Sequence, residues 1–309
     1  MIEVRNLSRF YENNTAIYDL TFKIQDNEIV GFLGLNGAGK STTLKILACL
    51  LEASSGEVTI DGENLATANV AFRSKIGFLP EEPPLYKEMT VSEFLLYLGQ
   101  LRGKSKQEIL TNLPSVLKKC QLQGHEHQLI SQMSLGYRKR VGIAQAIIHN
   151  PKLVILDEPI SGLDPYQIVE MREVIKNLSK DATILLSSHN LSEVAETCDR
   201  LLVLHDGKLI AQGTTQELSS TVRSHQRSVE MTIHSNGIDI QKALNEIPDV
   251  GNIIFHNSDS VCDVTIYTSE PTTSLVRTVV EKGLDVSRVI NRLDELEEIF
   301  LSLTQGEKQ

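Results

Sequence analysis

The sequence lacks any apolar run long enough to cross a membrane. A spanning helix needs about 18 to 20 consecutive apolar residues, and the longest apolar stretches here, such as residues 29–35 and 201–204, are far shorter. The first residues, Met-Ile-Glu-Val-Arg, lead directly into an alternating strand pattern, without the cationic and apolar regions of a secretory signal. We therefore expect no transmembrane helix and a cytoplasmic chain.

Cysteine motifs are also missing. The four cysteines, at positions 49, 120, 198 and 262, lie at least 64 residues apart. This spacing excludes CxxC redox and zinc arrangements and provides no disulfide framework. We expect ordinary thiols that are buried or half-buried.

No basic segment studded with aromatic residues is present. The chain has 30 Lys and Arg against 40 Asp and Glu, a net charge of −10. Residues 227–309 hold 7 basic and 14 acidic side chains, which leaves residues 1–226 close to neutral at −3. An acidic chain of this kind argues against nucleic acid as the main partner.

Length and pattern indicate two unequal domains. At roughly 150 residues per domain, 309 residues predict about two, and 41% hydrophobic with 23% charged residues is typical of a globular protein. Strands and helices alternate along the first part, interrupted by a helical insert at about 90–148 that opens with the capping box Thr90-Val-Ser-Glu93. The polar stretch at 214–228 predicts a linker, so we place the domains at 1–220 and 221–309.

The second domain has the pattern of a small α+β fold. Its predicted elements are strands at 229–234, 252–256, 261–268 and 286–290, and helices at 239–247, 272–282 and 293–303. The order is βαββαβ followed by a helix, which is the ferredoxin-like plan.

A phosphate-binding loop follows a buried strand at 28–33. The segment Gly34-Leu-Asn-Gly-Ala-Gly39-Lys40-Ser41 satisfies G-x-x-x-x-G-K-[ST], and a helix is predicted from about 40 to 51. Glycines at these positions let backbone N–H groups approach the β- and γ-phosphates, while Lys40 supplies a cation and Ser41 a ligand for Mg²⁺. The predicted nucleotide contacts are Gly34, Leu35, Asn36, Gly37, Ala38, Gly39, Lys40, Ser41 and Thr42.

A second buried strand, at 153–156, ends in two adjacent carboxylates, Asp157 and Glu158. The carboxyl ends of strands are where α/β sheets place their sites. Asp157 is suited to hold Mg²⁺ through water, and Glu158 to orient the attacking water. Alone, this segment could be a solvated turn that ends a strand; beside a phosphate-binding loop it predicts catalysis.

Over residues 1 to about 220 these motifs resemble the ATP-binding subunit of ATP-binding-cassette (ABC) transporters. Ser161-Gly-Leu-Asp164-Pro looks like the D-loop of that family, at the family's distance from the two carboxylates. His189 matches the switch histidine that contacts the γ-phosphate, and Tyr11 matches the aromatic residue that stacks on adenine.

The resemblance implies a P-loop NTPase cassette, with a mixed α/β sheet core and a helical subdomain at about 90–148. It implies an ATPase that uses ATP and Mg²⁺, in which Lys40, Glu158 and His189 have catalytic roles. Hydrolysis of ATP to ADP and phosphate would then be coupled to transport across a membrane.

The chain departs from the family at the signature motif. Met133-Ser134-Leu135-Gly136-Tyr137 stands where the family has LSGGQ. Ser134 can still cap the following helix, whose positive end attracts an anion. In the family this anion is the γ-phosphate bound to the other subunit, so the resemblance implies a homodimer in which Ser134, Gly136 and Asp164 contact nucleotide.

Three cations, Arg138, Lys139 and Arg140, follow the signature motif. Cationic side chains on a helix usually form a solvated face that covers apolar surface with their stems. We expect at least two of the three to do so.

A second departure lies at the Q-loop, Ile76-Gly-Phe-Leu-Pro80-Glu81, where Glu81 replaces the usual glutamine. A carboxylate can approach Mg²⁺ through an oxygen, but it cannot donate a hydrogen bond when ionised. The metal ligands implied by the resemblance are Ser41, Glu81 and Asp157.

Both departures are similar to those of cassettes that serve drug, lipid, polysaccharide and gliding-motility export systems with separate permeases, and the segment 296–304 resembles the tail of that group. The resemblance implies an integral-membrane permease as partner, contacted by the helical insert and the loop after Glu81. It also implies a second copy of the chain, no nucleic acid, and a peripheral location on the cytoplasmic face of the membrane.

Two alternatives stay open at this point. Cassettes also occur in proteins that act on nucleic acid or ribosomes, although those carry long heptad arms or a second cassette, which this chain does not. The C-terminal domain could assist assembly or act as a sensor that regulates the ATPase. The pair His125 and His127 does not share a helix face, so we expect no metal there.

Overall fold

The computed structural model divides the chain into two compact units, Met1–Thr215 and Gln216–Gln309. The residues that it describes are 1–12, 14–67, 69–222, 227–234, 239–245, 247, 250–255, 261–268 and 270–292. Among them, no helix combines the length and the apolar character that a membrane span requires. Each unit is described below by itself.

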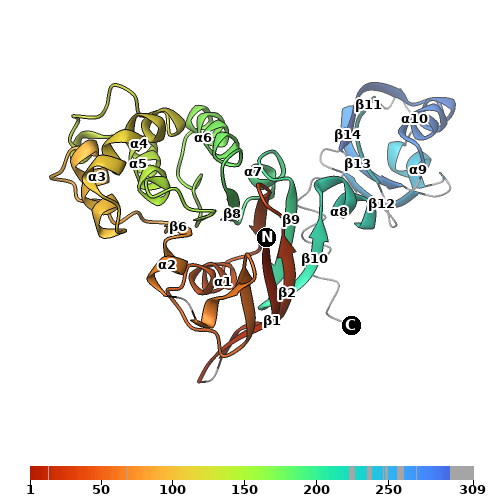
Figure 1. Ribbon diagram of the computed structural model, residues 1–309. Helices are drawn as coiled ribbons and strands as arrows, with labels where there is room; N and C mark the ends of the chain where they lie inside the picture. The colour runs from red at the N-terminus through yellow and green to blue at the C-terminus, as the bar shows by residue number, and fades with distance from the viewer. Residues whose placement is uncertain are drawn as a thin grey trace. The chain divides into compact units, whose positions relative to one another are not determined.

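The first unit is built around a six-stranded sheet in the order β10-β9-β3-β8-β7-β6 (Figure 1). Five of its strands run parallel, and only β10 is antiparallel to its neighbour. The strands are β3 (Ile29–Leu33), β6 (Ile76–Leu79), β7 (Leu153–Leu156), β8 (Thr183–Ser188), β9 (Arg200–His205) and β10 (Lys208–Gly213). Every residue of β3 and β7 is buried, as expected for central parallel strands covered on both faces. The buried strands predicted at 28–33 and 153–156 correspond to β3 and β7.

Helices connect these strands. The helix after β3 is α1 (Lys40–Leu47), α6 (Pro165–Leu178) joins β7 to β8, and α7 (Leu191–Ala195) joins β8 to β9. Because the strands run parallel, the loops that enter these three helices lie at the same edge of the sheet. This edge carries the phosphate-binding loop and the two carboxylates.

A second, antiparallel sheet of the first unit has the order β2-β1-β4-β5. Its strands are β1 (Ile2–Tyr11), β2 (Asn14–Ile24), β4 (Ser55–Ile60) and β5 (Glu63–Asn64), followed by the short helices η1 (Leu65–Thr67) and α2 (Val70–Arg73). Asp61 and Gly62 form the hairpin turn between β4 and β5, and both residues have positive φ, 51° and 77°. Buried side chains from the two sheets form one core, in which Phe22 of β2 meets Phe32 of β3 edge to face at 5.4 Å.

The helical insert consists of α3 (Val91–Leu101), α4 (Lys106–Lys119), η2 (Ile130–Gln132) and α5 (Leu135–Ile147). The capping box at Thr90 is confirmed, and Ser105 forms another at the start of α4. The insert is attached to the sheet through α5, where Gln145 Nε2 donates to Phe78 O at 2.9 Å. The prediction of a mixed sheet core with a helical insert is therefore confirmed.

The second unit contains a four-stranded antiparallel sheet in the order β12-β13-β11-β14 (Figure 1). Its elements are α8 (Thr215–Val222), β11 (Arg227–His234), α9 (Ile240–Asn245), β12 (Val250–Phe255), β13 (Val261–Thr268), α10 (Thr272–Glu281) and β14 (Asp285–Arg292). From β11 onward the order is βαββαβ, and the strand order is that of the ferredoxin-like plan. Apolar residues of both helices pack on alternate residues of the strands, among them Val229, Met231 and Leu275.

Two expectations about this part of the chain need comment. The polar stretch expected to be a linker instead begins with the helix α8, because a run of eight residues without Gly or Pro can satisfy its own backbone hydrogen bonds. The final helix predicted at 293–303 lies outside the described residues.

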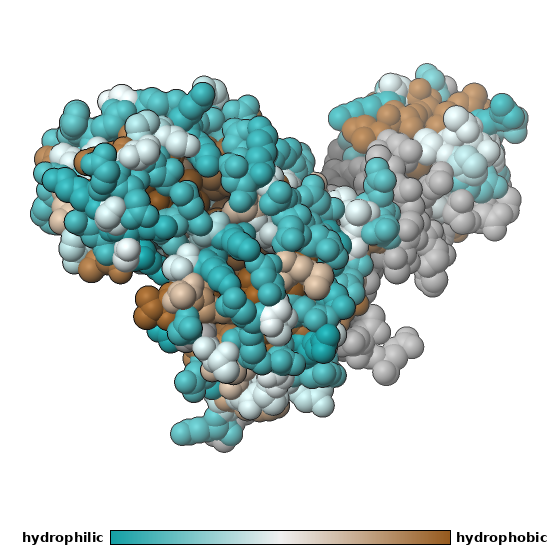
Figure 2. All heavy atoms as spheres, in the orientation of Figure 1, coloured by the Kyte–Doolittle hydropathy of each residue, from teal (hydrophilic) through white to brown (hydrophobic). Residues whose placement is uncertain are grey.

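The cysteines are free thiols, as predicted. Cys120 and Cys262 are buried, and Cys49 and Cys198 are half-buried. Burial raises the pKa of the Cys120 thiol to about 12. Figure 2 shows a mainly hydrophilic surface on this face of the first unit, with apolar residues scattered among polar ones, which is normal for a folded protein.

The core contact between the two sheets generates a stability prediction. Phe32 is fully buried against Phe22, so we expect Phe32→Ala to lower the free energy of unfolding by about 3 to 5 kcal/mol. Urea unfolding followed by circular dichroism measures the change. Phe10 is 46% exposed, and Phe10→Ala serves as the matched control. Equal losses from the two substitutions would contradict a shared core beneath the sheets.

Candidate functional site

The phosphate-binding loop lines a pocket of about 260 Å³ together with residues that follow β6, β7 and β8. The lining residues are Ala16, Leu35, Asn36, Gly37, Gly39, Lys40, Ser41, Thr42, Glu81, Glu158 and His189. All of them except Ala16 were predicted site residues. The fold therefore brings together four segments that are far apart in the sequence, because β3, β8, β7 and β6 are neighbours that end at one edge of the sheet.

Two glycines of the loop have no room for a side chain. Gly39 has φ of +100°, and a Cβ there would lie 2.7 Å from the backbone oxygen of Ala16. At Gly34 a Cβ would lie 2.6 Å from the backbone oxygen of Leu204. The loop is thus pressed against the second sheet and β9, which fixes the direction of its N–H groups at the start of α1.

Lys40 is a buried cation at the start of α1. Its Nζ donates to the backbone oxygens of Gly34 and Leu35 and lies 4.0 Å from Glu158 Oε1. Burial lowers the pKa of Lys40, while the neighbouring Glu158, Asp157 and Glu81 carboxylates oppose that shift. A cation held mainly by loop carbonyls is available to an anion that enters the loop.

Asp157 is buried at the end of β7. Ser187 Oγ donates to its Oδ1 at 2.6 Å, and Ser41 Oγ lies 3.4 Å from the same oxygen. A hydroxyl and a carboxylate at this separation are hard oxygen donors of the kind that Mg²⁺ prefers. Magnesium is usually held by one or two carboxylates together with substrate phosphates, so the residues present fit that ion.

Glu158 has an unusual backbone conformation, with φ of 48°. Its N–H donates to Ser187 Oγ at 3.0 Å, and its Oε2 lies 3.0 Å from His189 Nδ1. Burial raises the pKa of the Glu158 carboxyl, and the hydrogen bond to His189 opposes the rise. A left-handed backbone on a residue other than glycine is costly, and such conformations cluster at functional sites.

Six predicted nucleotide contacts do not line this pocket: Gly34 and Ala38 of the loop, and Tyr11, Ser134, Gly136 and Asp164. Tyr11 ends β1, and the Arg9 guanidinium covers its ring at 4.7 Å. Ser134 caps α5 by accepting from Tyr137 N, and Asp164 caps α6 by accepting from Gln167 N. Their assignment as nucleotide contacts stays a prediction.

The expectation for the cations after the signature motif is wrong. Lys139 and Arg140 are each only 4% exposed, and Arg140 pairs with Glu170 of α6. Both lie on the buried side of α5, which packs between β6 and α6. The sequence contained a signal of this burial. Lys139 is three residues from Gly136 and four from Ile143, so all three lie on the same, buried face of the helix.

Sequence reasoning also missed Ser187. This fully buried hydroxyl at the end of β8 contacts both carboxylate residues of the site, as donor to Asp157 and as acceptor from the Glu158 N–H. A polar residue at the end of an otherwise apolar strand was the available signal, because buried hydroxyls need partners.

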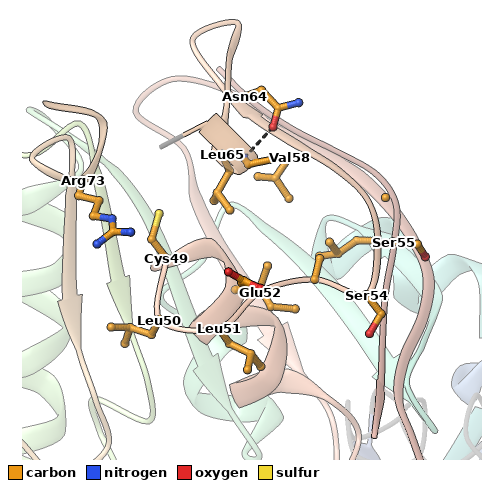
Figure 3. A pocket seen from close by; sticks show the side chains of 15 residues that line it. Cys49, Leu50, Leu51, Glu52, Ser54, Ser55, Val58, Asn64, Leu65 and Arg73 are labelled. Carbon is orange, nitrogen blue, oxygen red and sulfur yellow. Dashed lines mark hydrogen bonds between the residues drawn. The ribbon is translucent and has the colours of Figure 1, made fainter. Parts of the chain in front are cut away.

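A larger pocket of about 540 Å³ shares no lining residue with the first (Figure 3). Leu50 and Leu51, which follow α1, line it on one side, with Val58 of β4 and Leu65 opposite and Arg73 of α2 at its margin (Figure 3). None of the predicted site residues belongs to it.

Comparison with known proteins places these features in a family context. A family model described as ABC transporter matches residues 17–161. The chain is 33% identical over 308 residues to the uncharacterized ABC transporter ATP-binding protein YxlF of Bacillus subtilis (strain 168), covering 99% of this chain and 100% of that protein. It is 32% identical over 308 residues to the bacitracin transport ATP-binding protein BcrA of Bacillus licheniformis, with coverages of 99% and 98%.

A solved structure is similar over the first unit. The ATP-binding cassette MJ0796, in a dimeric post-hydrolysis state bound to ADP and Pi, has a TM-score of 0.63 at 25% identity. The match covers 69% of this chain and 98% of that one.

The loop glycines generate a prediction that needs no ligand. Gly37 and Gly39 both have positive φ, but a Cβ at Gly37 would meet nothing within 4 Å. We expect Gly37→Ala to cost about 1 to 2 kcal/mol of unfolding free energy through backbone strain alone, and Gly39→Ala to cost more because its Cβ also meets the Ala16 oxygen. Parallel urea titrations measure both. The reverse ranking would show that the loop is not pressed against β2.

Proposed function

This chain belongs to the ABC transporter family as an ATP-binding subunit with ATPase activity, and we propose that it drives export through a separate membrane permease. The observation that carries the catalytic part is the convergence of Lys40, Ser41, Asp157, Glu158 and His189 at one sheet edge. In phosphoryl transfer from ATP, each of these groups would act on the phosphates, on Mg²⁺ or on the attacking water.

In the proposed reaction, the loop N–H groups and Lys40 bind the β- and γ-phosphates and stabilise the charge that develops on the transferred phosphoryl group. Glu158 orients the attacking water from the side opposite the leaving group. His189 holds Glu158 at 3.0 Å and remains 54% exposed, so its ring can also reach the γ-phosphate.

Ser41 and Asp157 would hold Mg²⁺, and Glu81 would approach it from the loop after β6. When bound, the ion neutralises charge on the β- and γ-phosphate oxygens. Among the described residues, no group of three or more His, Cys, Asp or Glu side chains forms a metal site, which agrees with an ion held largely by phosphates.

We further propose that two copies close around two ATP molecules. Ser134, Gly136 and Asp164 do not line the pocket of their own chain, and in the closed pair they would contact the nucleotide bound by the other copy. The α5 N-terminus, capped by Ser134, would then direct its positive end at the γ-phosphate of the other copy. Binding of ATP to the closed pair would shift the population toward it.

The membrane partner is inferred from exposed apolar surface and from the relatives. Tyr86 and Tyr97, whose rings lie 5.8 Å apart, and Leu101 are all exposed on the loop after β6 and on α3. A permease segment docked there would cover them and would hold the chain at the cytoplasmic face of the membrane. BcrA is a bacitracin transport protein by name, which supports export of a drug-like compound.

The C-terminal part, proposed as a domain of residues 221–309 beside a cassette of residues 1–220, has no assigned chemistry. The described part of its sheet and helices has a core of its own. Assembly and regulation of the ATPase are both compatible with that structure.

Glu158→Gln tests the catalytic proposal. The amide keeps the size of the side chain but cannot act as a base, so we expect ATP turnover to fall about 10²- to 10⁴-fold while ATP still binds and dimers accumulate. Phosphate release and sedimentation with ATP measure the two effects. Glu52→Gln is the control, because Glu52 is an exposed carboxylate that does not line the pocket of the phosphate-binding loop. Turnover close to that of the unmodified chain would remove Glu158 from the mechanism.

Deletion of residues 223–309 tests the C-terminal part, with α8 retained. Constitutive ATPase activity in the shortened chain is the result expected of a regulatory domain. Loss of ATP-dependent dimers, or of permease association in a pull-down, is the result expected of an assembly domain. We expect the second outcome, since the pocket of about 240 Å³ on the described C-terminal sheet is small for a regulator.

A further inference from the structure

The proposed mechanism leaves one buried cation of the site unused. Lys139 on α5 is 4% exposed, and its Nζ donates to the backbone oxygen of Glu158 at 2.8 Å. Burial lowers the pKa of Lys139, and the carboxylates of Glu158, Glu81 and Glu193 oppose that shift. A buried ammonium is costly without such partners, so its position demands an explanation.

The hydrogen bond of Lys139 falls on the strained residue of the site. Glu158 has φ of 48°, in the left-handed region. Its N–H is held by Ser187 and its carbonyl by Lys139. Conformations of this kind persist only where the surroundings over-determine them. Here Ser187 holds the Glu158 N–H, and the Glu158 carbonyl accepts from Lys139 Nζ at 2.8 Å and more weakly from the Ser161 N–H at 3.3 Å. The carboxylate of Glu158 is thereby directed toward His189.

The charge of Lys139 also balances the pocket. Asp157, Glu158 and Glu81 bring three carboxylates to it, and Lys40 is the cation that the mechanism assigns to phosphate. Once Lys40 binds the phosphates of a nucleotide, Lys139 of α5 is still attracted electrostatically by the carboxylates of Glu158 and Glu81. Glu81 is the less common residue of its motif, and it adds a negative charge to a site that must also accept phosphates.

We propose that Lys139 is a positioning residue for hydrolysis: it holds the Glu158 backbone in its catalytic conformation and offsets the charge of Glu81. This proposal rests on the proposed function, because it needs Glu158 to act on water. Lys139 also ties α5, the helix capped by Ser134, to the residue that follows the end of β7, so one hydrogen bond connects the signature helix to the backbone of the catalytic glutamate.

The test compares Lys139→Met and Lys139→Arg in the full chain, by steady-state phosphate release and by equilibrium binding of a fluorescent ATP analogue. We expect Lys139→Met to lower kcat about tenfold to a hundredfold, as for a small misplacement of a catalytic group. Nucleotide affinity should stay within about twofold, because uniform binding is retained. Lys139→Arg, which keeps the charge and a donor, should restore most of kcat. Lys118→Met, at an exposed position of α4, is the matched control.

A double-mutant cycle with Glu81→Gln tests the charge balance. With Glu81 neutralised, the loss of kcat caused by Lys139→Met should be several-fold smaller than in the unmodified chain, because the two residues couple. A thermal melt accompanies each variant, and Lys139→Gln replaces Lys139→Met if the latter does not fold.

Three results would overturn the proposal. The first is an unchanged kcat in Lys139→Met, or in Lys139→Gln if that variant is used. The second is a parallel loss of kcat, nucleotide affinity and melting temperature that arginine does not rescue, which is the signature of a purely structural lysine. The third is an equal loss of kcat with and without Glu81→Gln, which removes the charge-balancing role.

If Glu158→Gln retains turnover, the proposed function fails as well. If Glu158→Gln is inactive and Lys139→Met has normal turnover, only the inference about Lys139 fails.

Discussion

The structure of the first unit depends on placing opposite charges together at an edge of the sheet that is largely withdrawn from water. Lys40, Lys139, Asp157 and Glu158 are all buried within the span of a few hydrogen bonds. None of them would be tolerated singly, since an unpaired buried charge is strongly destabilising. Together they compensate each other, and the same compensation leaves a pocket that accepts a further anion and cation as a pair. The charge pairing that stabilises the buried residues at this edge of the sheet therefore also prepares the pocket to bind Mg-nucleotide.

Local sequence was sufficient for most of the fold because the local and the overall preferences agree. Buried parallel strands such as β3 and β7 have continuous apolar sequences, and the helical insert begins with a capping box. The strands of the ferredoxin-like unit were placed to within two residues at each end, as expected for strands bounded by polar turns. The exceptions are elements without a strong period. The short helix α8 is one of them, because its polar composition alone described it as a linker.

The candidate site shows the same difference between what the local sequence predicts and what it does not. Residues that belong to contiguous motifs, such as the phosphate-binding loop, were predicted, and the pocket contains them. Ser187 and Lys139 were not, because their roles are set by partners 29 and 19 residues away in the sequence. Lys139 was read as part of a cationic surface, and only the packing of α5 against β6 and α6 reverses that interpretation. Pairwise contacts across a fold are the information that a single sequence does not contain.

The free cysteines have a consequence for the chemical behaviour of the protein. The thiolate is the reactive form of cysteine, and burial raises the pKa of Cys49, Cys120 and Cys198 above the ordinary value. At neutral pH these three sulfurs are therefore almost entirely protonated and poor nucleophiles, and Cys262 is shielded by its own buried position. The chain should resist oxidants and alkylating reagents while folded. A spin label or fluorophore attached to one added surface cysteine would then report on a single site, without removal of any native thiol.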